Sequence, residues 1–124
     1  MKVSIVICTR RRPALLARCL SAVANLDPGP SQVIVVDTSP GDKETKEVAQ
    51  KFGAHYALEP KAGVNRARQR GLAESETEAV VFLADDDMPE TNWLATQMAS
   101  SAQKKSTGST GKVLKIDKKP RKPS

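Results

Sequence analysis

Six apolar residues run straight into three aspartates in the stretch Ala79-Val80-Val81-Phe82-Leu83-Ala84-Asp85-Asp86-Asp87. The apolar run is short, uninterrupted and rich in valine, which is typical of a strand buried on both faces of a parallel sheet. A sheet buried on both faces needs helices to cover each side. The stretch therefore predicts an α/β protein in which an acidic turn leaves the carboxyl end of a buried strand.

Strand-like runs of the same kind recur earlier in the chain. Val3–Cys8 and Val33–Val36 are apolar and β-branched, and His55–Leu58 is a weaker candidate. Helical patterns and capping residues alternate with these runs and predict helices from Pro13 to the loop at 27–30, and at 42–52, 62–73 and 90–102. Strands alternating with helices at this spacing predict right-handed crossovers and a doubly wound parallel sheet.

Polar residues follow three of the expected strands. Thr9 and Arg10 follow the first, Asp37 ends the second, and the three aspartates end the fourth. In doubly wound sheets ligands bind at the carboxyl ends of the strands. We therefore expect these side chains to meet in one crevice.

The acidic turn at 85–87 has two interpretations. Adjacent carboxylates repel one another unless a cation compensates them, and Mg²⁺ or Mn²⁺ is commonly held by one or two carboxylates together with substrate phosphates. The alternative is a solvated acidic turn without a ligand. Its position directly after a buried strand favours the metal.

Other charged residues also have two interpretations. Asp37 caps its own loop or accepts hydrogen bonds from a ligand's ring nitrogen or ribose hydroxyl. In the helix at 62–73, Arg66 and Arg70 share a face while Arg68 points elsewhere. Such arginines are ordinarily solvated, but one directed into the crevice would bind a diphosphate bidentately.

The formal charge of +6 is concentrated at the carboxyl terminus. Residues 103–124 hold eight Lys or Arg and one acid, whereas residues 1–102 hold 12 basic and 13 acidic side chains. The composition of 103–124 is typical of a disordered segment. We therefore expect a domain at 1–102 and a basic low-complexity tail at 103–124, in which Val113-Leu114 and Ile116 could form a short strand with nothing to pair with.

Several common sites are missing from the sequence. No glycine-rich dinucleotide motif follows the first strand and no Walker A loop is present, so a dinucleotide oxidoreductase is not favoured. The single histidine, His55, and the two cysteines, Cys8 and Cys19, are expected to be structural. The cysteine usage and the lack of a signal peptide favour a reducing cytoplasm, with association at a membrane surface as the alternative. No apolar stretch is long enough to span a bilayer.

Four motifs in this order resemble the amino-terminal half of the family 2 glycosyltransferases, which have the GT-A fold. Val3–Pro13 is similar to the opening strand and "P-T-x-N-R" turn, and Val33–Asp37 to the second strand with its nucleotide-binding aspartate. Gly63–Gly71 resembles the "G-x-x-x-A-R-N-x-G" helix, and Phe82–Leu94 the D-x-D region. Cys8, Arg11, Thr38 and Gln69 depart from the usual residues of these motifs, which are proline, asparagine, aspartate and asparagine respectively.

The resemblance implies a site for a nucleotide-diphosphate sugar and a divalent metal, Mn²⁺ or Mg²⁺. Thr9, Arg10 and Asp37 would contact the base and ribose, and Arg68 the diphosphate or the loop around it. Asp85 and Asp86 would also lie at the nucleotide sugar, with Asp85 near the ribose or a metal-bound water. Asp87 would be the direct metal ligand. Family members invert the anomeric centre by direct displacement. The acceptor is left open by the sequence, with a saccharide and a lipid-linked saccharide as the candidates.

The general base and the acceptor-binding half of the family follow the D-x-D region, where this chain has its basic tail. No residue at 103–124, Asp117 included, resembles that base. We therefore expect little or no transferase activity from this polypeptide alone, unless a second chain completes the domain. Two alternatives remain: a non-catalytic remnant, and a weak binder of anionic surfaces acting through the tail, without a specific nucleic-acid partner.

Overall fold

A computed structural model describes residues 2–39, 43–61, 63–100 and 111–114 of the 124-residue chain. The elements in chain order are β1 Val3–Thr9, α1 Pro13–Ala24, β2 Gln32–Asp37, α2 Lys43–Lys51, β3 His55–Leu58, α3 Val64–Glu74, β4 Ala79–Ala84, α4 Trp93–Ser100 and β5 Gly111–Leu114. The helices and strands expected from the sequence are therefore present, with their ends shifted by a few residues. The expected cap at Asp42 lies outside the described residues.

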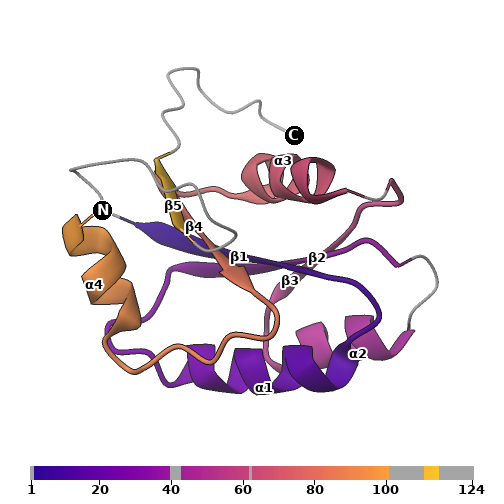
Figure 1. Ribbon diagram of the computed structural model, residues 1–124, viewed down its shortest axis with the longest axis horizontal. Coiled ribbons are helices and arrows are strands. Elements are labelled where there is room, and N and C mark those ends of the chain that lie inside the picture. The colour runs from indigo at the N-terminus through magenta and orange to yellow at the C-terminus, as the bar shows by residue number, and fades with distance from the viewer. Residues whose placement is uncertain (1, 40–42, 62, 101–110, 115–124) are drawn as a thin grey trace.

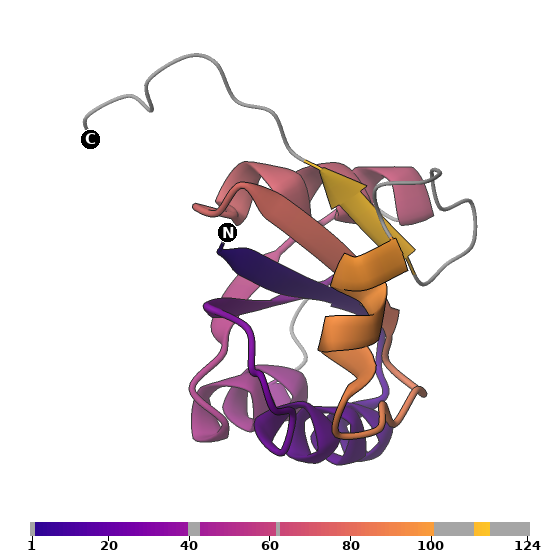
Figure 2. The same cartoon turned by 90° about the vertical axis from the view of Figure 1, so that its left-hand side faces the viewer.

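The sheet has the order β3-β2-β1-β4-β5, and β1 to β4 are parallel. β1 is central and pairs with β2 on one side and β4 on the other, in register from Val3 to Thr9. α1 and α2 cover one face of the sheet and α3 the other (Figure 1). Viewed from the side, the same three layers are seen with α4 next to the sheet edge that carries β5 (Figure 2). This is the doubly wound α/β fold that the sequence predicts.

Each face of the sheet has its own apolar core. On the α1 and α2 face, Ile5, Ile7, Val81 and Leu83 pack with buried residues of α1 and with Leu94 of α4. On the α3 face, Val6, Ile34, Val36, Val80 and Phe82 pack against Ala67. Aliphatic residues that point alternately to the two faces bury both of them, which explains why the strands read as continuous apolar runs.

α3 lies unusually close to the sheet. A Cβ atom at Gly71 would lie 2.4 Å from Cγ1 of Val6, inside van der Waals contact. Only glycine therefore allows the helix to rest on the central strand. The amino-terminal end of α3, at Gly63, lies beside the carboxyl end of β1, where Gly63 and Thr9 line the same cavity.

One expectation about the carboxyl-terminal segment is wrong. Residues 111–114 form β5, which pairs antiparallel with β4, with Val113 opposite Val80 and Leu114 opposite Ala79. Without β5, β4 would be an edge strand with unpaired backbone groups, and such an edge accepts another strand. The other residues of 103–124, Asp117 included, lie outside the described residues.

Candidate functional site

Three loops meet at the carboxyl edge of the sheet. They follow β1, β2 and β4, which are neighbours in the sheet, so the parallel arrangement brings together residues far apart in sequence. A pocket of about 330 Å³ opens there. We call it the β1–β2 pocket; its lining includes Thr9, Arg10, Arg12, Thr38, Gly63 and Asp85. The expected crevice is therefore present, and Thr9, Arg10 and Asp85 line it.

Asp85 is the buried carboxylate of this crevice. The residue is 6% exposed, and its Oδ2 accepts a hydrogen bond of 2.8 Å from the hydroxyl of Thr9. Its Oδ1 lies 3.3 Å from Nη1 of Arg12, which forms an ion pair with it. Burying a carboxylate is costly unless it is paired and hydrogen-bonded, and Thr9 and Arg12 provide both. Arg12 occupies the arginine place of the "P-T-x-N-R" turn, and this match could have identified it; its reach to the end of β4 is visible only in the folded chain.

The turn between β1 and α1 sends its arginines to opposite sides. Arg11 has a φ of 54°, a left-handed conformation that non-glycine residues seldom adopt. Its backbone N–H donates to Oγ of Ser39. Arg10 extends toward β2 and donates a 2.7 Å hydrogen bond to the carbonyl of Thr38, whereas Arg12 extends toward β4. The two arginines therefore flank the end of the central strand.

Asp37 caps its own loop. It is fully buried, and Oδ1 accepts hydrogen bonds from the backbone N–H of Ser39 at 2.8 Å and from the Ser39 hydroxyl. Oδ2 accepts a 2.6 Å hydrogen bond from the hydroxyl of Tyr56 on β3. Of the two interpretations of Asp37, the structural one is present in the described residues. A contact with a nucleotide base stays a proposal.

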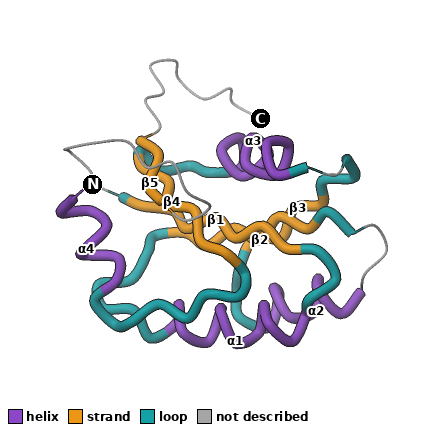
Figure 3. Tube along the Cα trace, in the orientation of Figure 1, coloured by secondary structure: helices purple, strands orange, loops and turns teal. Residues whose placement is uncertain are grey.

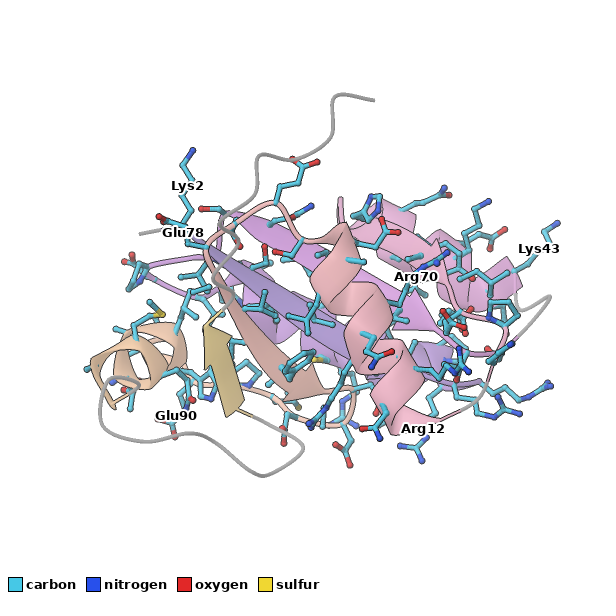
Figure 4. All side chains as sticks on the ribbon, turned by 90° about the horizontal axis from the view of Figure 1, so that it is seen from above. Lys2, Arg12, Lys43, Arg70, Glu78 and Glu90 are labelled. Carbon is cyan, nitrogen blue, oxygen red and sulfur yellow. The ribbon has the colours of Figure 1, made fainter. Side chains whose placement is uncertain are left out.

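Arg68 lies on the sheet side of α3, over the ring of Phe82 at 4.9 Å from the ring centroid. It lines a second pocket of about 370 Å³, here called the β4 pocket, which also includes Val6, Arg12, Phe82, Asp85 and Asp86. Arg70 points the other way, toward β3, where it lies near Glu59 and Glu74 and donates to the carbonyl of Leu58 (Figure 4). Of these two arginines, only Arg68 is thus directed toward the acidic turn.

The acidic turn is arranged around a backbone hydrogen bond from the N–H of Asp87 to the carbonyl of Ala84, 3.1 Å long. The side chain of Asp86 is exposed and that of Asp87 is partly buried. The loop then runs alongside α1 to α4 (Figure 3), held by a hydrogen bond from the N–H of Asp27 to the carbonyl of Thr91. The turn is therefore fixed at both ends.

The carboxylates of the acidic turn supply only part of the ligands that the expected metal ion needs. Within the ranges that the structure describes, no three His, Cys, Asp or Glu side chains form a group able to hold a metal ion. Carboxylate oxygens are nevertheless suitable ligands, and Mg²⁺ and Mn²⁺ are often held by one or two carboxylates plus phosphates. The residues therefore fit a metal that arrives with a phosphate ligand rather than a preformed cage.

Both cysteines are packed thiols. Cys19 is fully buried on α1, and its thiol donates to the carbonyl of Ala84 at 3.6 Å. Burial, followed by the charges of Asp85, Asp87 and Asp86, raises the pKa of Cys19 to about 12. Burial also raises the pKa of Cys8 to about 11, although the nearby Arg68 acts in the opposite direction. Protonated thiols are poor nucleophiles, so neither cysteine is suited to covalent chemistry.

His55 lies far from this crevice. It starts the edge strand β3, and its Nε2 is 2.6 Å from Oε1 of Glu74 on α3. This contact links the edge strand to the helix above it, in agreement with the structural role expected for His55. None of the helices in the described ranges combines the length and apolar composition needed to cross a membrane.

Comparison with known proteins places this architecture in a family. Residues 4–123 match the family described as glycosyl transferase family 2. No curated protein sequence matches the chain at a significant level.

Solved structures with the same fold include two proteins from bacteria. S. aureus TarS, residues 1–349, superposes with a TM-score of 0.69 at 24% identity, over 80% of this chain and 32% of that one. Glucosyl-3-phosphoglycerate synthase from Mycobacterium tuberculosis, in complex with Mn²⁺, UDP and glucosyl-3-phosphoglycerate, gives 0.68 at 21% identity, over 79% of this chain and 38% of that one. The chain thus spans about a third of the length of these two structures.

Proposed function

The chain belongs to glycosyl transferase family 2, and from this premise we propose that it carries the donor site of a metal-dependent, inverting nucleotide-sugar glycosyltransferase. The observation that carries the proposal is the contact between Thr9 and Asp85. These residues end two neighbouring strands, β1 and β4, and join the wall of the β1–β2 pocket to the acidic turn. A nucleotide in the pocket would therefore lie next to the carboxylates that hold its metal.

The residues divide by their position in the crevice. Thr9 and Arg10 line the β1–β2 pocket and would contact the base and ribose, with Asp37 fixing the loop beneath them or reaching the base after a rearrangement. Arg68 lines the β4 pocket, where a guanidinium would bind the diphosphate. Asp85 and Asp86 would lie at the nucleotide sugar.

Asp87, with Asp85 nearby, would hold Mn²⁺ or Mg²⁺ together with the diphosphate. When bound, such an ion stabilises the negative charge that develops on a departing diphosphate. Solved structures of the M. tuberculosis synthase contain Mn²⁺ and UDP, which makes this pair the first ligand to test. The chain's own contribution is to place the diphosphate between cationic and acidic side chains.

The chain spans 19 to 40% of the length of the solved structures described above and others like them. We propose that residues 1–102, with β5, form the donor-binding unit and that this polypeptide has little or no transferase activity alone. A second chain that supplies the base and the acceptor site, for a saccharide or a lipid-linked saccharide, would complete it.

Isothermal titration with UDP in the presence and absence of Mn²⁺ tests the donor site directly. We expect Mn²⁺-dependent binding that Asp87→Ala weakens about tenfold or more, since hydrogen bonds and contacts to charged groups contribute roughly 1.5–3 kcal/mol. Glu78→Ala is the matched control, because it removes the same charge at the opposite end of the sheet (Figure 4). Equal binding by the wild type and Asp87→Ala would contradict the proposal.

The same samples separate the donor site from a non-catalytic remnant. A cooperative thermal transition that Mn²⁺ and UDP shift upward is expected for a folded binding unit, because a ligand that binds only the native state stabilises it. A broad transition that does not respond to these ligands would favour the remnant.

A further inference from the structure

Arg12 stands where the two pockets of the crevice meet. The β1–β2 pocket and the β4 pocket have Cys8, Arg12 and Asp85 in common. The side chain of Arg12 is 55% exposed, whereas that of its partner Asp85 is 8% exposed. One member of this ion pair is therefore held in place by the fold, and the other is largely in solvent.

The backbone on both sides of Arg12 is fixed. Arg11 is held in its left-handed conformation by the hydrogen bond to Ser39, and Pro13 begins α1. Arg12 itself makes no side-chain hydrogen bond that caps the helix. The guanidinium can consequently change its partner by side-chain rotation alone, while the turn stays unchanged.

Asp85 needs a positive charge beside it whether or not a ligand is present. Thr9 satisfies Oδ2 by a hydrogen bond, and Arg12 supplies the positive charge at Oδ1. A divalent cation bound at the acidic turn would supply more positive charge close to the same carboxylate. The cation and the guanidinium would then compete for Asp85, since like charges repel at short range.

A diphosphate in the crevice offers the displaced guanidinium a second partner. Arginine binds phosphate oxygens through two parallel N–H donors, and this geometry suits a group that lies between two pockets. Arg10 is less suited to this role, because its Nη1 already donates to the carbonyl of Thr38. Arg11 is not among the residues that line either of the two pockets.

We propose that Arg12 is an exchangeable counter-ion: it pairs with Asp85 in the free protein and transfers to the diphosphate when metal and nucleotide bind. This inference rests on the proposed donor site and adds a positioning residue to it. Arg12 thereby holds the side chain of Asp85 in place before the ligand arrives. It opposes binding of the metal alone and favours binding of the metal together with the nucleotide.

The test measures two affinities in the same variants: that of Mn²⁺ alone, from the electron paramagnetic resonance signal of free Mn²⁺, and that of UDP at saturating Mn²⁺, by isothermal titration. In Arg12→Ala we expect Mn²⁺ to bind several-fold more tightly and UDP about tenfold more weakly. The two changes have opposite signs because the guanidinium competes with the metal and assists the nucleotide. A purely structural role for Arg12 would not produce them.

Three further variants keep the test decisive. Arg12→Lys retains the charge without the bidentate fork, so Mn²⁺ affinity should stay near that of the wild type while UDP affinity is intermediate. Lys51→Ala removes one positive charge at the end of α2 and should change neither affinity. Arg12→Gln repeats the measurement if Arg12→Ala does not fold.

Failure of this inference can be distinguished from failure of the proposed function. If the wild type does not bind UDP with Mn²⁺, the proposed donor site is refuted, and the proposed exchange of Arg12 is refuted with it. If the wild type binds UDP but Arg12→Ala shifts both affinities in the same direction, or neither, the donor site stands and the exchange is refuted.

Discussion

The two ends of the parallel sheet both bury polar side chains, but they do so differently. At the amino end, the hydroxyl of Ser4 contacts those of Thr77 at 2.7 Å and Ser75 at 3.0 Å and donates to the side-chain carbonyl of Gln32. These groups are neutral and satisfy one another. At the carboxyl end, Asp85 is charged, and its ionic partner Arg12 is largely exposed. Figure 4 marks the two ends by Lys2 and Glu78 on one side and Arg12 on the other.

The difference separates polar groups whose partners all lie within the fold from a carboxylate that lines an open pocket. A closed network of hydroxyls gains nothing from an additional partner, since its donors and acceptors are already used. A buried carboxylate next to a pocket and a movable cation can exchange one partner for another. Burial of a polar residue is therefore not evidence of function unless an open volume and an exchangeable partner accompany it.

Asp37 lies at the carboxyl end of the sheet, but like the hydroxyls at the amino end it is hydrogen-bonded within the fold. Substituting it should have the largest effect on the free energy of unfolding. Asp37→Ala leaves the N–H of Ser39 and the hydroxyl of Tyr56 without their acceptor, so we expect a loss of about 3 kcal/mol in the free energy of unfolding, measured by urea denaturation. Asp37→Asn retains one acceptor oxygen and should lose less than half of this. If Asp37→Asn instead abolishes UDP binding at unchanged stability, the carboxylate contacts the nucleotide.

Gly71→Ala should destabilise the chain by about 2 kcal/mol through overpacking against Val6. The clash lies on the α3 face of the sheet, between its two polar ends. Adding Val6→Ala should recover part of the loss in a double-mutant cycle of thermal denaturation. Without such recovery, the close approach of α3 to β1 is not the reason for the glycine.

A matched pair of hydroxyl deletions compares the two ends directly. Ser75→Ala at the amino end should lower the free energy of unfolding by about 1.5 kcal/mol and leave UDP affinity unchanged. Thr9→Val at the carboxyl end should cost about 1 kcal/mol and also weaken UDP binding about fivefold. Urea denaturation and isothermal titration give the two quantities. A fall in UDP affinity with Ser75→Ala would remove the distinction drawn between the ends.

The buried thiols should make the fold sensitive to alkaline pH. The pKa values of Cys8 and Cys19 are raised in the folded state, to about 11 and about 12 from 9.0, so unfolding releases protons above pH 9. Their contribution to stability is complete below about pH 9 and is lost as the pH rises toward 11 and 12. We expect a loss of about 1 kcal/mol per thiol by pH 10 in metal-free urea denaturation. Cys19→Ala should show a shallower decline; an identical slope would contradict the assignment.

Much of the fold could be predicted from local sequence because its signals are local. Short, mostly apolar runs predicted β1, β2 and β4, and Pro13 marked the start of α1 at its first helical position. The rule that parallel strands end at one edge then brought Thr9 and Asp85 together across 76 residues. β5 was missed as a paired strand because its pairing depends on an edge that exists only once the sheet has formed.

The sequence determined the alternation of strands and helices, and hence which residues lie at the carboxyl edge, because periodicity and turn chemistry act over a few residues. The tertiary structure determined which side chains at that edge have all their partners inside the fold and which are paired with an exposed side chain. Asp37 and Asp85 look alike in sequence, each ending an apolar strand, yet one is enclosed by Ser39 and Tyr56 and the other pairs with Arg12 beside a pocket. That difference arises from contacts across strands and loops, where burial and the partner's exposure set the cost of exchanging one partner for another.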